Sequence, residues 1–242
     1  MIPDYSTIPL IETHCHTGWE SNIIELQKTE NLRYALLIDD NWPRVIALAR
    51  KDLAHRGALL ALNPTKQSID ELRKVIMDNR DAVKGIKLNP SADAYTADMT
   101  TLDSVFALAN EMGVILVTHT DASSPAGRFG PVLAKHPRTT LILYHACPMD
   151  EAFALVKKYH NVYIDVSFTA FNKDLQQAAL KQTGRKKIVF GIDSPLGFPQ
   201  KDGRCLPHYR DAAAEVGAFY GHDKDVVEHV LYRNAMHMLK LK

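Results

Sequence analysis

Short, nearly continuous apolar runs recur along the chain. In the segments between them, apolar residues are separated by polar ones at regular intervals. The runs consist mainly of aliphatic and β-branched residues, in lengths typical of buried parallel strands. They predict eight strands, at Leu10–His14, Tyr34–Ile38, Ala58–Leu62, Gly85–Leu88, Val114–Thr118, Leu141–Tyr144, Val162–Val166 and Ile188–Gly191.

The segments between these runs place apolar residues at helical intervals and carry cap signals. Ser68 and Glu71 form a capping-box pattern, Gly113 is suited to follow a helix end, and Asp150 is expected as an N-cap. Helices are predicted after Ser68, from Leu102 to Met112, after Asp150, from Asn172 to Gly184, and from Asp223 to about Leu239.

Strand and helix thus alternate along the whole sequence. This pattern predicts a parallel sheet with right-handed crossovers, and eight such units can close into a (β/α)8 TIM barrel. An open doubly wound sheet is disfavoured, because the first strand is followed by Thr17-Gly18-Trp19 rather than by a glycine-rich phosphate turn. No linker divides the 242 residues, so 1–242 are predicted to form a single domain.

Composition adds mainly exclusions. The chain is 46% hydrophobic and 24% charged with a net charge of +1, and it has no basic block, so no nucleic-acid partner is expected. Neither a signal-peptide pattern nor an apolar run of bilayer length is present, which predicts a cytoplasmic location and no membrane partner. Three cysteines without framework spacing suit a reducing compartment.

Residues with metal-binding or acid–base chemistry follow the predicted strands. Each alone has an ordinary explanation, as a hydrogen-bonded strand-end residue, a turn starter or a surface lysine. Their shared position is informative, because the carboxyl ends of barrel strands meet at one mouth, and residues two apart on a strand face the same way. The residues are His14, His16, Lys87, His119, His145 and Asp193. A metal site at the barrel mouth is therefore predicted.

These motifs, taken in order, resemble a known family. From IETHCHTG through GIKLNP, VTHT, LYHACP and FGIDSP to YRNAMHMLKL, the chain resembles the amidohydrolase superfamily of metal-dependent hydrolases, and most of all its amidohydrolase-related (amidohydrolase 2) branch. The resemblance implies that His14, His16 and Asp193 hold a divalent cation, expected to be zinc, with His119 as a fourth ligand. It also implies that a metal-activated water attacks the substrate, that Asp193 transfers its proton, and that the metal or His145 polarises the substrate carbonyl.

Lys87 bears on the number of ions. In two-metal relatives a lysine at this position is carboxylated and bridges the ions, with His119 and His145 on the second one. An unmodified lysine beside a dication should instead lose its proton, turn away or bind a substrate anion. A single ion is favoured, and two ions with carboxylated Lys87 stay open as the alternative.

Three functions remain. The first is hydrolysis of a small amide, cyclic amide or lactone, the second is non-oxidative decarboxylation by the same branch, and the third and most remote is a non-catalytic metal-binding scaffold. Substrate contacts are predicted for Trp19, Lys87, Arg128 and Arg204. The two arginines indicate an anionic group on the substrate, with solvated loop charges as the ordinary alternative. A small-molecule substrate is expected, and a homo-oligomer is left open.

Overall fold

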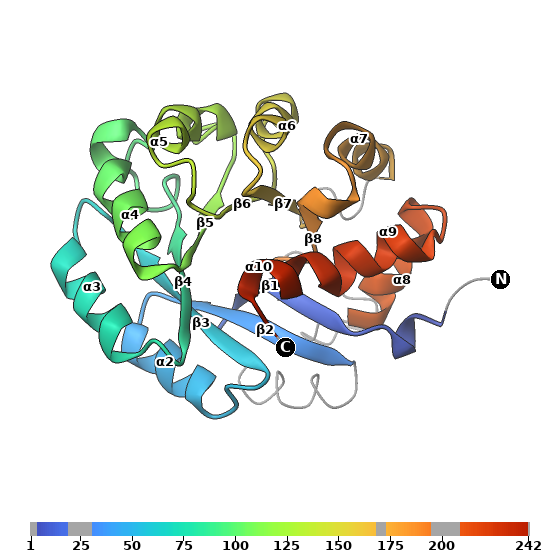
Figure 1. Ribbon diagram of the computed structural model, residues 1–242, viewed down its shortest axis with the longest axis horizontal. Helices are drawn as coiled ribbons and strands as arrows, with labels where there is room; N and C mark the ends of the chain where they lie inside the picture. The colour runs from blue at the N-terminus through green and yellow to red at the C-terminus, as the bar shows by residue number, and fades with distance from the viewer. Residues whose placement is uncertain (1–3, 19–30, 168–172, 195–208, 242) are drawn as a thin grey trace.

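Eight parallel strands form one sheet, in the order in which they occur in the chain (Figure 1). The computed structural model describes residues 4–18, 31–167, 173–194 and 209–241. The strands are β1 (Leu10–His16), β2 (Leu32–Asp39), β3 (Arg56–Leu62), β4 (Val83–Leu88), β5 (Ile115–His119), β6 (Leu141–Tyr144), β7 (Val162–Asp165) and β8 (Ile188–Val189).

Backbone hydrogen bonds join the two outermost strands and bring the sheet into a barrel. Thr13 N donates to Phe190 O at 3.0 Å, and further along Ser194 N donates to His14 O at 2.9 Å. The residues that follow the short strand β8 therefore run beside β1, where Cys15 and Ser194 form a parallel bridge. The predicted (β/α)8 TIM barrel is confirmed.

Helices surround the strands on the outside of the barrel (Figure 1). They are α2 (Trp42–Arg50), α3 (Ile69–Asp78), α4 (Met99–Met112), α5 (Gly130–Lys135), α6 (Met149–Lys158), α7 (Lys173–Thr183), α8 (Tyr209–Phe219), α9 (Lys224–Glu228) and α10 (Asn234–Leu239). Short 3-10 turns lie at Tyr5–Thr7, Ala126–Phe129 and Arg185–Lys187, and a π-helical turn at His229–Arg233 joins α9 to α10. None of the described helices is long and apolar enough to cross a bilayer.

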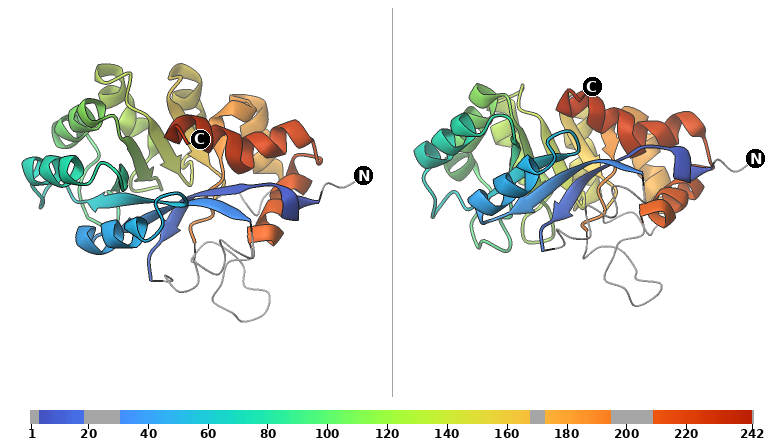
Figure 2. Two further views of the ribbon diagram at one scale, coloured as in Figure 1. Left: turned by 60° about the horizontal axis from the view of Figure 1, so that its bottom comes forward. Right: turned by 90° about the horizontal axis from the view of Figure 1, so that it is seen from below.

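Alternating residues on the strands form two apolar cores. On β2, Tyr34, Leu36 and Ile38 belong to the cluster inside the barrel, whereas Ala35 and Leu37 pack in the layer between sheet and helices. Successive strand residues point to opposite faces, so one strand supplies both layers. The interior cluster also includes a residue of α10, and Figure 2 shows this helix on the side opposite the tip of the β1 arrow. The end of the barrel where β1 terminates is left for polar side chains.

The predicted caps are confirmed at two positions and wrong at a third. Ser68 Oγ accepts a hydrogen bond from Glu71 N, and Gly113 ends α4 in the left-handed conformation with φ of 68°. Asp150 is not an N-cap, because α6 begins at Met149 directly after Pro148, and Asp150 lies in its first turn. The extended backbone of Pro148 starts the helix earlier than the side-chain signal indicates.

Candidate metal centre

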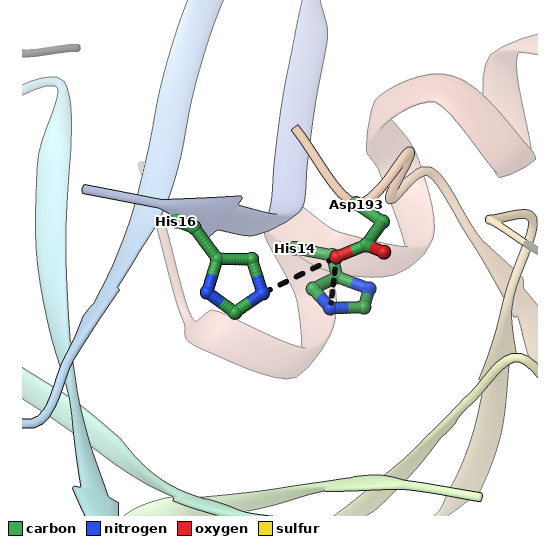
Figure 3. A group of neighbouring side chains, drawn as sticks. All are labelled: His14, His16 and Asp193. Carbon is green, nitrogen blue, oxygen red and sulfur yellow. Dashed lines mark ion pairs between the residues drawn. The ribbon is translucent and has the colours of Figure 1, made fainter. Parts of the chain in front are cut away.

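Two histidines of β1 and one aspartate that follows β8 converge at the barrel mouth (Figure 3). Asp193 Oδ1 lies 3.0 Å from His14 Nε2 and 3.2 Å from His16 Nε2. Their ligand atoms all lie within 4.8 Å of one another, and within the described ranges no other set of three or more His, Cys, Asp or Glu side chains does so. We call His14, His16 and Asp193 the three-residue group.

The seam between β8 and β1 positions Asp193. His16 N donates to Ser194 O at 2.8 Å and Ile192 N donates to Glu12 Oε1 at 3.1 Å, so the backbone on both sides of Asp193 is held against β1. Asp193 has φ of 55°, in the left-handed region that aspartate tolerates better than most residues. A Cβ added at Gly191 would lie 3.1 Å from His14 Cβ and 3.2 Å from Asp165 Oδ2, so a glycine allows this close approach.

Asp165, at the end of β7, is a buried site residue that the sequence reasoning missed. Its Oδ2 accepts a hydrogen bond from His14 Nδ1 at 2.9 Å, and its Oδ1 accepts from His145 N at 2.9 Å and from Ser167 Oγ at 3.0 Å. A carboxylate on Nδ1 fixes the orientation of a histidine and directs its Nε2 toward a metal. The available signal was an acidic residue inside the apolar run VYIDV.

Tyr144, at the end of β6, holds the same histidine from one face. Its ring stacks on His14 with the centroids 3.6 Å apart and the planes 16° from parallel. The Tyr144 hydroxyl donates a hydrogen bond to Thr13 O. His14 is therefore fixed both at Nδ1 and on its ring face, which preorganises its Nε2 for binding.

Burial favours neutral histidines around the three-residue group. It lowers the pKa of His16 and of His119, and it lowers the pKa of His145 to about 4. Burial alone would raise the pKa of Asp193, but hydrogen bonds with His14 and His16 outweigh that effect, so the pKa of Asp193 is lowered. Neutral imidazole and ionised carboxylate are the forms that bind metal ions.

The donor set fits a divalent cation. Two imidazole nitrogens and one carboxylate oxygen suit zinc and the other first-row divalent ions. His14 Nδ1 faces Asp165, so Nε2 is the nitrogen directed at Asp193 Oδ1, 3.0 Å away. A cation bound by both atoms would take the place of the hydrogen bond between them. His14, His16 and Asp193 could therefore hold the metal.

Comparison with known protein families gives a match that covers most of the chain. A sequence model of the family described as Amidohydrolase matches residues 33–241. This chain belongs to the amidohydrolase family. Family members are enzymes that act on small molecules with a divalent metal ion. The matched span contains His119, His145 and Asp193, whereas His14 and His16 precede it. No curated protein matches the chain.

Solved structures share the fold of this amidohydrolase at low sequence identity. A proposed 2-pyrone-4,6-dicarboxylic acid hydrolase from Pseudomonas putida has a TM-score of 0.73 and 13% identity, over 97% of this chain and 98% of that chain. A 2,6-dihydroxybenzoate decarboxylase from Rhizobium has a TM-score of 0.68 and 13% identity, over 97% and 99%. A 5-carboxyvanillate decarboxylase from Novosphingobium aromaticivorans, in complex with manganese and 4-hydroxy-3-methoxy-5-nitrobenzoic acid, has a TM-score of 0.70 and 12% identity, over 99% and 98%. At such identity the likeness shows the fold alone.

The other two predicted histidines of the amidohydrolase adjoin the three-residue group. The ring centroids of His119 and His145 lie 4.5 Å apart, and those of His14 and His145 lie 5.2 Å apart. His119 Nε2 lies 3.1 Å from Asp121 Oδ2, and His145 Nδ1 lies 2.9 Å from Ser167 Oγ. Neither histidine belongs to the set whose ligand atoms converge. Their roles as fourth ligand and as polarising group remain predictions.

Lys87 points inward, against the ordinary expectation of a surface lysine. The residue is 3% exposed, and its Nζ lies 4.2 Å from the centroid of the Tyr144 ring. Burial lowers the pKa of Lys87 to about 7, the loss of proton affinity expected for an unmodified lysine in this position. The residue lines a cavity of about 270 Å³, which we call the β1–β4 hollow. Its walls are His16, Thr17, Ile38, Asp39, Asp40, Ala61, Lys87, Asn89 and Asp93.

The predicted substrate contacts have different outcomes. Arg128 lies on the 3-10 turn Ala126–Phe129 with an exposed side chain, and it does not line the β1–β4 hollow. Trp19 and Arg204 fall outside the described residues. The structure therefore describes two of the four predicted contacts, Lys87 and Arg128. Of these two, Lys87 lines the same hollow as His16 of the three-residue group.

Proposed function

We propose that this amidohydrolase is a metal-dependent, non-oxidative decarboxylase of a small carboxylic acid. The observation that carries the proposal is the composition of the three-residue group. Two neutral imidazoles and one carboxylate leave a bound divalent ion with a net positive charge, which suits a substrate that is itself a carboxylate. Two of the three structures compared above are decarboxylases, which favours this reaction over the hydrolysis expected from the motifs.

In a decarboxylation, the bond between the substrate carbon and its carboxylate breaks, and carbon dioxide leaves. The electron pair of that bond stays on the substrate carbon, which then takes up a proton. A bound divalent ion would supply positive charge for binding the carboxylate and for the charge that develops as the bond breaks. Asp193 is proposed both to hold the ion and to take part in proton transfer.

His145 is proposed as the second group that handles the proton. Ser167 Oγ gives its hydrogen to Asp165 Oδ1, so it accepts from His145 Nδ1. A neutral His145 then carries its proton on Nδ1 and has a lone pair on Nε2. That nitrogen is the end that takes up a proton and passes it to the substrate.

Hydrolysis is the second candidate. The same lone pair on His145 Nε2 can accept the proton of a water that attacks a carbonyl carbon. The Pseudomonas putida structure, described as a proposed hydrolase, shares the fold as fully as the decarboxylases do. A lactone or cyclic amide would be the substrate in this case.

A substrate panel separates the two. Metal-loaded protein is incubated with small unsaturated and aromatic carboxylic acids and, in parallel, with lactones and cyclic amides. The proposal expects carbon dioxide from at least one acid, abolished in Asp193→Asn. Acid release from a lactone or cyclic amide without any carbon dioxide would overturn it in favour of the hydrolase. Activity that persists unchanged without metal would contradict both.

Several further features are proposed with this function. We infer one divalent ion, with zinc expected from the donor set and manganese as the alternative, because one structural neighbour holds it. Residues 1–242 are proposed to act as one catalytic domain in the cytoplasm. Elemental analysis of purified protein identifies the metal, and size-exclusion chromatography with light scattering decides whether the chain forms an oligomer.

A further inference from the structure

The β1–β4 hollow borders the three-residue group without being part of it. His16 lines both, so a molecule bound at the metal centre can extend into the hollow. The volume of about 270 Å³ is enough for a compact organic group. The walls come from β1 to β4 and the residues just after these strands, where barrel enzymes bind their substrates.

Lys87 carries a buried amine with no polar partner within hydrogen-bond distance among the described residues. Within the part of the chain that the structure describes, its Nζ makes no hydrogen bond or ion pair and lies over the Tyr144 ring. Burying an amine without an acceptor costs free energy, and that cost is recovered when a ligand supplies the acceptor. A carboxylate is the acceptor that matches an amine in either protonation state best, because it offers two oxygens and a negative charge.

The β1–β4 hollow is also lined by three aspartates, Asp39, Asp40 and Asp93, whose charge is opposite to that of a protonated lysine. Asp39 is satisfied, since Thr17 Oγ1 and Asn41 N donate to it and Arg44 Nη1 lies 3.3 Å from its Oδ2. Asp93 is different, because its carboxylate makes no hydrogen bond or ion pair among the described residues.

Asp40 stands beside these two carboxylates. It is exposed. Burial raises the pKa of Asp93 and the charge of Asp40 adds to that shift, against the opposing charges of Lys66 and Lys87. The hollow therefore offers the buried amine of Lys87 and, on another part of its wall, the carboxylate oxygens of Asp93 and Asp40.

We propose that the β1–β4 hollow binds a substrate that carries both a carboxylate and a protonated amine, with Lys87 Nζ on the carboxylate and Asp93 and Asp40 on the ammonium group. The inference rests on the proposed function, since it assigns the substrate class of the same site. A plain carboxylic acid would leave the Asp93 carboxylate without a hydrogen-bond donor among the described residues, and a plain amine would leave Lys87 without an acceptor.

The test uses manganese-loaded protein and isothermal titration calorimetry. The probes are the ω-amino acids from glycine to 6-aminohexanoate, compared with the straight-chain carboxylic acids and alkylamines of the same lengths. At least one amino acid is expected to bind ten times more tightly than both of its matched compounds. The inference is overturned when no amino acid in the series binds more tightly than its matched acid.

Two substitutions assign the preference to its residues. Lys87→Met should bring the affinity for the preferred amino acid down to that for the matched amine, and Asp93→Asn should bring it down to that for the matched acid. Lys74→Met and Asp78→Asn change the same residue types on exposed positions of α3 and should leave the preference intact. An unchanged preference in both hollow variants would overturn the assignment.

Metal content separates failure of this inference from failure of the proposed function. The hollow variants should keep the metal content of the wild type, measured before and after titration, so that removal of the ion by the amino acids is detected. A wild-type protein that binds no metal would refute the proposed function. A metal-loaded protein that shows no preference for amino acids would refute the inference alone.

Discussion

The two halves of the barrel rim carry similar residues and differ in how far these residues converge. On the β1–β8 side, His14, His16 and Asp193 bring their ligand atoms within 4.8 Å. On the β5–β6 side, His119 and His145 have adjacent rings, but recorded hydrogen bonds lead to their own neighbours Asp121 and Ser167.

Backbone contacts explain the difference. The bonds of Ser194 with His14 and His16 hold the residues after β8 directly against β1, so the side chains on both sides of that seam face one point. At the end of β6, His145 and Ala146 turn away from the strand with φ of 69° and 47°. We therefore expect the first half to bind the metal and the second half mainly to act on the substrate.

The largest contrast is expected in metal affinity. His16→Ala should weaken binding by about 300-fold or more, because losing one of three ligands removes roughly a third of a binding free energy of about 10 kcal/mol or more. His119→Ala should weaken it by only about tenfold, as expected for a peripheral fourth ligand. Competition with a chelating indicator measures both values. Equal losses would erase the distinction between the two halves.

Substitution on the β5–β6 side should lower turnover more than it lowers metal affinity. His145→Gln keeps a hydrogen-bonding side chain but removes the group that handles the proton, so the turnover number should fall by about 10²- to 10⁴-fold. Metal affinity should stay within about threefold of the wild type, because His145 lies outside the three-residue group. Steady-state kinetics on the substrate found in the panel, together with the same chelator assay, provides the check. Loss of metal along with turnover would make His145 a ligand instead.

Asp165 connects the two halves, since it bonds to His14 on one side and to His145 and Ser167 on the other. Asp165→Asn should lower metal affinity by about 10- to 100-fold, the usual effect of removing a carboxylate behind a histidine ligand. Asp103→Asn is a matched control, because this half-exposed carboxylate on α4 also bonds to a histidine, His136, but to none of the site residues. An Asp165 variant with unchanged affinity would show that His14 needs no such support.

The smallest effect concerns stability. Lys87→Met should stabilise the protein without substrate by about 1–3 kcal/mol, because it removes a buried amine that has no acceptor. Urea unfolding measures the change, and Lys74→Met, on the exposed face of α3, should stay within about 0.5 kcal/mol of the wild type. Destabilisation by Lys87→Met would mean that the amine already has a partner that supports the fold.

Most of the fold could be predicted from periodicity alone. The eight apolar runs coincide with the eight strands because a strand buried on both faces has to be apolar along its length. Errors fall at the ends, where hydrogen bonding rather than composition decides. The strand β1 extends through His16 because Ser194 pairs with it, and the helix predicted from Asp223 to Leu239 contains a π-helical turn.

The site was predicted less completely, for a physical reason. The positions of His14, His16 and Asp193 follow from strand order, which the sequence contains. Asp165 was missed because its importance depends on a hydrogen bond to a residue 151 positions away across the barrel. The exposed placement of Arg128 likewise depends on how one loop folds, which residue type does not determine.

The number of metal ions tests the central claim most directly. Elemental analysis of the wild type and of Lys87→Ala, each purified with and without bicarbonate, counts the ions per chain. A site built on the three-residue group alone predicts one equivalent in all four samples. Two equivalents in the wild type with bicarbonate, falling to one in Lys87→Ala, would show that a carboxylated Lys87 bridges two ions and would contradict the account.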